Sequence, residues 1–256
     1  MSVHLEVKFE DEICDYLRSK KWLYEKGDAA KYNKGLALYP DDLIDWLKES
    51  QPEEWEALLN KHGSRAVAEL LQHVRDQLNR AGTLDVLRQG ISVIGLKNDL
   101  KIAEFNSTLA MNSQIICRYK ANRLRVVRQV QYSLSNDNSI DLVLFLNGIP
   151  VATVELKTDN TQNIEKAVEQ YKNDRNPKSH DKRIEPLLTF PSGALVHFAV
   201  SNREVRMATK LEGRKTFFLP FNKGSEPGGK SCGAGNPITD GHQTEYLWKE
   251  IWDRDN

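Results

Sequence analysis

The chain has 256 residues, and its 36 basic side chains balance 36 acidic ones, so its formal charge is zero. Apolar residues make up 39% and charged residues 28%, which indicates a soluble globular protein and excludes a disordered or fibrous chain. The longest uninterrupted apolar run, Leu142–Leu146, is far shorter than the roughly 20 residues that a membrane helix needs.

The first eighty or so residues are predicted to be mostly helical. Apolar residues recur at helical spacing among charges over Phe9–Lys20. Pro40 and Pro52 each begin a further helix, because proline and the acidic residues that follow it are both favourable in a first turn. Ser64 is predicted to cap a longer helix, which Gly82 ends.

From Gly90 onward the pattern changes to alternating, β-branched segments that predict strands. The predicted strands are Ile91–Leu96, Arg123–Leu134, Ile140–Leu146, Val151–Lys157 and Ala194–Val200, the last being apolar enough for a buried central strand. Asn147-Gly148 is a strong hairpin signal, and Asn163–Arg175 returns to helical spacing. This order of helices and strands predicts an α/β domain.

The segment Ile140–Lys157 carries the residues best suited to chemistry. Glu155 and Lys157 share one face of their predicted strand, and Asp141 opens the preceding strand and can join them across the hairpin. Two carboxylates that face one point beside a lysine form a hard-oxygen site for Mg²⁺, as phosphodiester hydrolysis uses. A surface salt bridge of Lys157 is the alternative, and on spacing alone it is the commoner outcome.

The geometry of the hairpin makes this hypothesis testable. A two-residue turn would pair Leu146 with Ile149, which would place Asp141 opposite Val154 and point it away from Glu155. The chemistry requires Asp141 to lie opposite Glu155, which needs one extra residue in the hairpin. We therefore predict a loop or bulge near Asn147–Pro150 and convergence of the three side chains on one pocket.

Asp141…Glu155-Leu-Lys157 resembles the PD-(D/E)xK nuclease signature, and the whole string Ser139–Lys157 is similar to the N-terminal nuclease domain of the restriction subunit of type I restriction-modification enzymes. Further short sequence segments are similar to this family, in the same order, along essentially the whole chain. They are Val127-Arg-Gln-Val, Ala167-Val-Glu-Gln-Tyr, Val196-His-Phe-Ala-Val, Phe218-Leu-Pro-Phe-Asn-Lys-Gly, Gly233-Ala-Gly-Asn-Pro and Tyr246-Leu-Trp.

The resemblance implies an α/β fold with a restriction-endonuclease-like PD-(D/E)xK core, in which helices flank a central mixed β-sheet. Residues 1–215 would form the nuclease domain, with a helical N-terminal elaboration at about 36–85. Residues 216–256 are rich in glycine and proline and would form a linker that starts the connection to an ATP-driven helicase motor.

The same resemblance implies catalytic roles. Asp141 and Glu155 would hold Mg²⁺, or Mn²⁺ in its place, and Lys157 would be the catalytic cation. Gln170 matches the glutamine of the family's QxxxY element, which supports the active site, although Asp174 stands where the tyrosine is expected. Glu10 matches an acidic position that such nucleases aim at the metal. A solvated acid at a helix start is the alternative for Glu10.

In function, the resemblance implies an endonuclease that cuts unmodified foreign DNA without reading its sequence, within a complex with modification and specificity subunits. ATP would enter only through the motor, so the isolated chain is expected to be weak or inactive. Two other functions stay open: a catalytically vestigial DNA-binding or subunit-assembly module, and a stand-alone repair nuclease of the same fold.

Charge is distributed unevenly along the chain. Residues 1–60 carry 8 basic and 14 acidic side chains, whereas residues 118–183 carry 12 and 8. Since basic side chains displace phosphate counterions, we place double-stranded DNA near the second segment. Arg123, Arg125 and Arg128 are the predicted DNA contacts, and an ordinary solvated face is the alternative.

Two further patterns bear on function and location. Gly224–Ser231 fits GxxxxGK[ST], but a helix-breaking run follows, so we reject a phosphate loop there. His197 is expected to be a packed strand residue. The three cysteines are widely spaced and never paired as CxxC, and no secretory signal is visible, which together predict free thiols in a cytoplasmic protein with no membrane contact.

Overall fold

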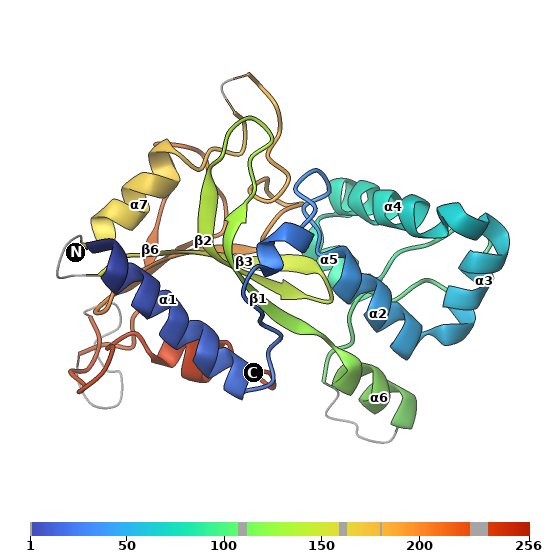
Figure 1. The fold of residues 1–256 in the computed structure, drawn as a ribbon, viewed down its shortest axis with the longest axis horizontal. Helices are drawn as coiled ribbons and strands as arrows, with labels where there is room; N and C mark the ends of the chain where they lie inside the picture. Colours follow the sequence, from blue (N-terminus) through green and yellow to red (C-terminus); the bar gives the residue numbers. More distant parts are fainter. Residues whose placement is uncertain (1, 107–111, 159–162, 180, 226–234) are drawn as a thin grey trace.

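A computed structural model describes residues 2–106, 112–158, 163–179, 181–225 and 235–256 of the chain. Within them, six strands form one mixed sheet in the order β1-β2-β3-β4-β5-β6 (Figure 1). The strands are β1 (Leu124–Gln131), β2 (Ser139–Leu146), β3 (Ile149–Leu156), β4 (Val196–Val200), β5 (Val205–Ala208) and β6 (Leu219–Pro220).

Neighbouring strands pair antiparallel except β3 and β4, which are parallel. A parallel pair needs a crossover, and helix α7 (Ile164–Asn173) lies within this connection. β4 is central and its last four residues are buried, as its apolar run predicted. A mixed sheet flanked by helices confirms the expected fold class and is consistent with a PD-(D/E)xK nuclease-like core.

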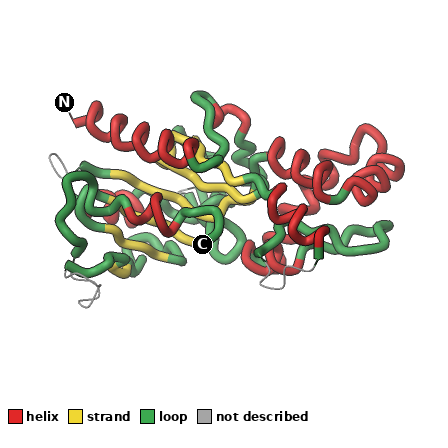
Figure 2. Tube along the Cα trace, turned by 90° about the horizontal axis from the view of Figure 1, so that it is seen from below, coloured by secondary structure: helices red, strands yellow, loops and turns green. Residues whose placement is uncertain are grey.

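Each face of the sheet is covered by its own elements, because successive strand side chains point to opposite faces. Helix α1 (Ser2–Ser19) and the π-helical turn η3 (Leu247–Ile251) pack on the face that carries Leu142, Leu144 and Val154. Helix α7 packs on the face that carries Val143. Figure 2 shows α1 running along one side of the sheet. None of the described helices is both long and apolar enough to span a membrane.

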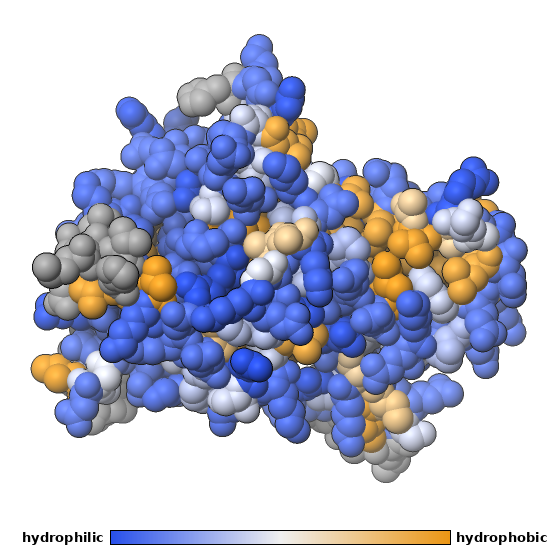
Figure 3. Space-filling model, viewed as in Figure 1, coloured by the Kyte–Doolittle hydropathy of each residue, from blue (hydrophilic) through white to orange (hydrophobic). Residues whose placement is uncertain are grey.

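A body of helices stands beyond one end of the sheet (Figure 1). It consists of α2 (Pro40–Ser50), α3 (Pro52–His62), α4 (Ala66–Ala81) and α5 (Thr83–Gln89), with α6 (Ser113–Ala121) beside it. Its apolar core surrounds the buried Trp46 and Leu78 and reaches the sheet through Ile149. On the face seen in Figure 3, much of the hydrophobic surface lies over these helices. The helical elaboration expected at 36–85 therefore corresponds to a packed subassembly.

Two local predictions are wrong. Ile91–Leu96 forms no strand: Ile91 makes a single bridge to Leu100, and both side chains are buried among the helices, away from the sheet. Ser64 caps no helix, since it lies in a short 3-10 turn (η2, Gly63–Arg65) that precedes α4, and α4 has no side-chain cap. Ile91 is therefore placed by tertiary packing that its local sequence does not specify, whereas Ser64 is exposed in a turn that links α3 to α4.

The description of residues 216–256 as a linker also needs correction for the part that the structure describes. β6 extends the sheet, and Tyr246, Leu247, Trp248 and Trp252 are buried in the core under α1. These aromatic side chains bury too much apolar surface to belong to a free linker. Most of Gly224–Ser231 lies outside the described residues.

Buried ion pairs join the helical body to the sheet. Arg125 of β1 donates to Asp28 at 2.5 Å and, through two nitrogens, to Asp42 at 2.6 and 3.0 Å. Its guanidinium also lies 4.3 Å from the ring centre of Tyr39. Asp42 lies in the first turn of α2 and is completely buried, and Arg123 donates to it at 3.2 Å. The arginines therefore neutralise carboxylates that would otherwise be costly to bury.

We predict that Arg125→Met lowers the free energy of unfolding by about 3–5 kcal/mol, because it leaves the buried carboxylates of Asp28 and Asp42 without their main partner. Equilibrium urea unfolding measures this change. The matched control is Arg65→Ala, which removes an exposed i,i+4 pair with Glu69 and should leave the midpoint unchanged. Equal midpoints for Arg125→Met and the wild type would contradict the role of this network.

Candidate functional site

The β2–β3 hairpin has the register that the chemistry requires. At its tip, Leu146 pairs with Ile149 and Phe145 with Pro150, across a turn in which Asn147 and Gly148 have φ of 49° and 77°. The register then shifts, and Leu144 pairs with Ala152. Val151 is the extra residue, so the predicted bulge exists and lies one residue beyond Pro150.

Beyond the bulge the pairing continues through Leu142 and Val154, which places Asp141 opposite Glu155. One oxygen of Asp141, Oδ2, accepts a hydrogen bond from the backbone N–H of Leu156 at 2.8 Å. Its other oxygen accepts from Nε2 of Gln129, on β1, at 3.2 Å. The carboxylate is thus held between the two strands that flank β2.

Glu155 is fully buried on the face of the sheet that α7 covers. Its Oε1 accepts a hydrogen bond from Nε of Arg175 at 2.7 Å, whereas Oε2 is buried and has no hydrogen-bond partner among the described residues. Burial, and then the charge of Asp141, raise the pKa of Glu155 well above its ordinary value, against the opposing charges of Arg175 and Lys157. A cation beside Oε2 would relieve both costs.

Lys157 follows directly after β3 and is 8% exposed. Its backbone N–H donates to Val200 of the parallel strand at 2.9 Å, which fixes the chain at this point. Its ammonium lies 3.5 Å from a carboxylate oxygen of Glu6 on α1 and close enough to Glu155 to lower that residue's pKa. The structure therefore brings Asp141, Glu155 and Lys157 into one charged cluster.

Helix α1 contributes a second carboxylate one turn after Glu6. Glu10 is 3% exposed and accepts hydrogen bonds from Arg128 at 2.8 Å and from Gln129 at 3.0 Å. Burial, followed by the charge of Asp141, raises its pKa. The alternative of a solvated helix-start acid is therefore wrong, and Glu10 faces the same cluster. Its role toward a metal stays a prediction.

Gln170 and Arg175 lie at the end of α7. The carbonyl of Gln170 accepts the N–H groups of Asp174 and Arg175 at 2.9 and 3.2 Å, and this turn directs Arg175 back to Glu155. The side chain of Gln170 is half-buried and makes no hydrogen bond to any residue that the structure describes. Arg175 is the residue that the sequence analysis missed, because nothing in its local pattern distinguishes it from a solvated helix-end cation.

The three predicted DNA contacts form no exposed basic face. Arg125 is 8% exposed and paired as described above, and Arg123 pairs with Asp42 and Asp45. Arg128 pairs with Glu10 and Asp11. The prediction of a free basic surface at these positions is wrong, because each guanidinium already neutralises carboxylates of its own chain. Charge reversal at these arginines would place two like charges together and leave carboxylates unpaired, so it would disturb the fold as well as any contact with DNA.

A buried hydrogen-bond chain supports the sheet behind Glu155. Oγ1 of Thr153 lies 2.8 Å from the hydroxyl of Tyr171 on α7 and 2.7 Å from Nδ1 of His197 on β4. His197 is 1% exposed, and burial lowers its pKa to about 3. It is therefore a neutral, packed residue, as expected.

This shift predicts a pH dependence of stability. Below pH 6.5 the unfolded chain binds a proton at His197 that the folded chain excludes until pH falls to about 3. Stability from this residue is thus complete above pH 6.5 and lost on acidification, by at most about 1.4 kcal/mol per pH unit. Urea unfolding at pH 7 and pH 5 (about two units apart) should show a smaller loss for His197→Gln than for the wild type. Identical losses in His197→Gln and the wild type would refute the assignment.

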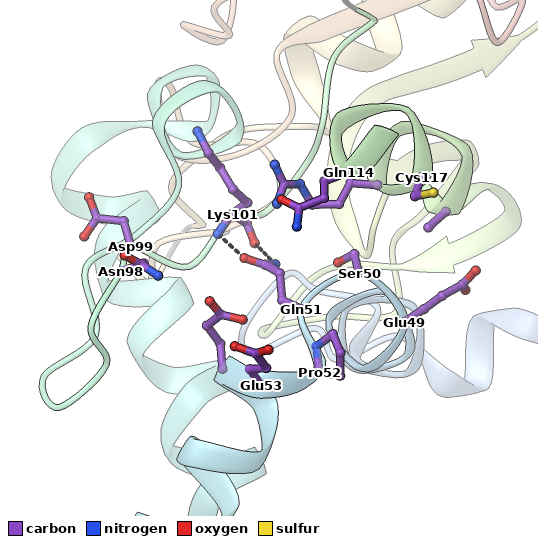
Figure 4. Close-up of a pocket in the computed structure, with 13 residues that line it drawn as sticks. Glu49, Ser50, Gln51, Pro52, Glu53, Asn98, Asp99, Lys101, Gln114 and Cys117 are labelled. Carbon is purple, nitrogen blue, oxygen red and sulfur yellow. Dashed lines mark hydrogen bonds between the residues drawn. The ribbon is translucent and has the colours of Figure 1, made fainter. Parts of the chain in front are cut away.

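A separate polar cleft of about 720 Å³ lies where the α2–α3 junction faces the loop before residue 101 and helix α6 (Figure 4). Acidic side chains, among them Glu49, Glu53 and Asp99, line it. Gln51 braces its wall with two hydrogen bonds to the backbone of Lys101, at 2.9 and 3.0 Å. None of the strand carboxylates lines this cleft, so the charged cluster is a different site.

The described residues include no group of three or more His, Cys, Asp or Glu side chains arranged to hold a metal ion. Asp141 and Glu155 are two carboxylates, and Mg²⁺ is commonly held by one or two carboxylates together with water and phosphate oxygens. The unpartnered Oε2 of Glu155 fits such a cation.

Comparison with known families gives a match over most of the chain. The model of the family described as "Type I restriction enzyme R protein N terminus" matches residues 10–216. The search of curated proteins found no match.

Proposed function

Since the chain belongs to the family of type I restriction enzyme R protein N-terminal domains, we propose that it is the Mg²⁺-dependent endonuclease domain of such an enzyme. It would hydrolyse phosphodiester bonds of unmodified foreign DNA within a larger ATP-driven complex. The observation that carries the proposal is the pair of facing carboxylates, the half-buried Asp141 and the buried Glu155, with Lys157 beside them and one oxygen of Glu155 without a hydrogen-bond partner among the described residues.

Asp141 and Glu155 would hold Mg²⁺, with Mn²⁺ as a substitute and Glu10 as a further ligand. The bound ion would polarise a phosphate and make a water molecule more acidic. The protein's part is to present the carboxylates in place. The N–H of Leu156 fixes Asp141, and Arg175 occupies one oxygen of Glu155 while leaving the other free.

Lys157 would place a positive charge beside the reacting phosphate and orient the attacking water. Its ammonium is part of the charged cluster, and its only ion pair among the described residues is with Glu6 at 3.5 Å, a long contact that an incoming phosphate can replace. Gln170 would support this site from α7.

A catalytically vestigial DNA-binding or assembly module is the second candidate. It is favoured by the Glu155–Arg175 ion pair, which already neutralises one of the two carboxylates, and by Asp174 at the position of the family's tyrosine. The two candidates differ in one measurable property, since only the nuclease needs to bind a divalent cation at Asp141. DNA and the modification and specificity subunits would be partners in both cases, with ATP used by the motor.

We predict that Lys157→Ala and Asp141→Asn, each placed in the R subunit and assembled with the modification and specificity subunits, reduce Mg²⁺-dependent DNA cleavage about 100-fold or more. ATP hydrolysis by the same complexes should be unchanged, because the motor does not depend on these side chains. Plasmid cleavage and ATP hydrolysis, measured in parallel, test this.

Lys166→Ala is the control, because Lys166 is exposed on α7 and pairs only with Glu169 among the described residues. It should cut like the wild type. Continued cutting by Lys157→Ala would remove Lys157 from the mechanism. A wild-type complex that hydrolyses ATP on DNA but does not cut would favour the vestigial module.

A further inference from the structure

Gln129 interrupts β1 at the point where β1 faces Asp141. Its φ is 49°, in the left-handed region that residues other than glycine rarely adopt inside a strand. Arg128 pairs with Leu142 and Val130 with Ile140, so the register is the same on both sides of Gln129, and only the position opposite Asp141 drops out of the pairing. The backbone at Gln129 is therefore distorted locally, without any inserted residue.

The distortion turns the carboxamide of Gln129 toward two carboxylates. Its Nε2 donates to Glu10 at 3.0 Å and to Asp141 at 3.2 Å, while its Oε1 accepts from the hydroxyl of Ser139 at 3.1 Å. The orientation of the amide is settled by these partners, because its oxygen would be repelled by two carboxylates. One side chain thus links α1 to β2 across the edge of the site.

The carboxylates of Asp141 and Glu10 repel each other, so other groups must hold them in place. Burial raises the pKa of Glu10 most, and the charge of Asp141 raises it further because the two carboxylates repel each other. Arg128 forms an ion pair with Glu10, but it is shared with Asp11. Only Gln129, among the described residues, hydrogen-bonds both carboxylates, and it does so without adding charge.

We infer that Gln129 is a positioning residue for a divalent cation, holding the carboxylates of Asp141 and Glu10 side by side at the site. The inference rests on the proposed function. A neutral amide suits this task, because it links the two carboxylates without adding to the positive charge that Arg128 already brings to Glu10. Such partners behind metal-binding carboxylates commonly change metal affinity about 10- to 100-fold when removed.

The backbone of Gln129 allows a test that separates positioning from stability. Glycine adopts a positive φ freely, so Gln129→Gly deletes the bridge while relieving the local strain. The fold should therefore survive the change. Gln129→Asn is a second variant, because asparagine tolerates the left-handed region but is one methylene too short to reach both carboxylates.

The experiment is a calorimetric titration of the chain with Mn²⁺, together with thermal unfolding of each variant. We expect wild-type binding, about 10- to 100-fold weaker binding for Gln129→Gly and Gln129→Asn at an unchanged unfolding midpoint, and no binding for Asp141→Asn. Excess Mn²⁺ should restore the wild-type stoichiometry in the Gln129 variants but not in Asp141→Asn. Gln131→Gly, at the exposed end of the same strand, is the control and should bind like the wild type.

Wild-type affinity in both Gln129 variants, with binding still lost in Asp141→Asn, would overturn the inference and leave the proposed function intact. Equal weakening in Gln131→Gly would also overturn it, because the effect would then come from β1 as a whole. Absence of Mn²⁺ binding by the wild type would overturn both the inference and the proposed nuclease.

Discussion

The position of Asp141 relative to Glu155 depends on a single bulge in β3, at Val151. Side chains alternate between the two faces of a strand, so a change of one in the register exchanges every residue between them. The tip of the hairpin follows a two-residue turn, and Val151 then shifts the pairing by one. Asp141 and Glu155 come to lie opposite each other only because of that shift. The turn itself is tightly packed: the carbonyl of Gly148 accepts the N–H of Tyr39 at 2.8 Å, and a Cβ at Gly148 would lie 2.3 Å from the Tyr39 carbonyl oxygen.

The charge asymmetry of the sequence is resolved inside the molecule. The early segment that is rich in acid supplies Glu10, Asp28 and Asp42, and β1 supplies the arginines that neutralise them. These ion pairs join α1 and α2, which are far apart along the chain, to the same strand, β1. Buried carboxylates are tolerated only with such partners, which is why these arginines are structural and are not available to DNA.

The cluster around Asp141 departs from the rules that the rest of the fold obeys. Gln129 has a strained backbone inside a strand, and Glu155 keeps one buried oxygen without a hydrogen-bond partner in the part of the chain that the structure describes. The charge of Asp141 also acts on both Glu10 and Glu155. Elsewhere in the described chain, buried carboxylates have arginine, hydroxyl or backbone N–H partners. Under the proposed function, the binding of a cation and a phosphate would restore the stability that is lost locally here, as is usual for functional sites.

The strands of the hairpin, the need for one extra residue in it and helix α7 were all predictable from the sequence, because they follow from local periodicity and turn chemistry. The sequence motifs also indicated the family. The sequence did not predict that Gln129, Arg175 and Glu6 join the site, that the arginines of β1 are neutralised, or that Trp248 and Trp252 complete the core. These contacts join residues distant along the chain, and neither spacing nor composition records which long-range partner a charged or aromatic side chain will meet.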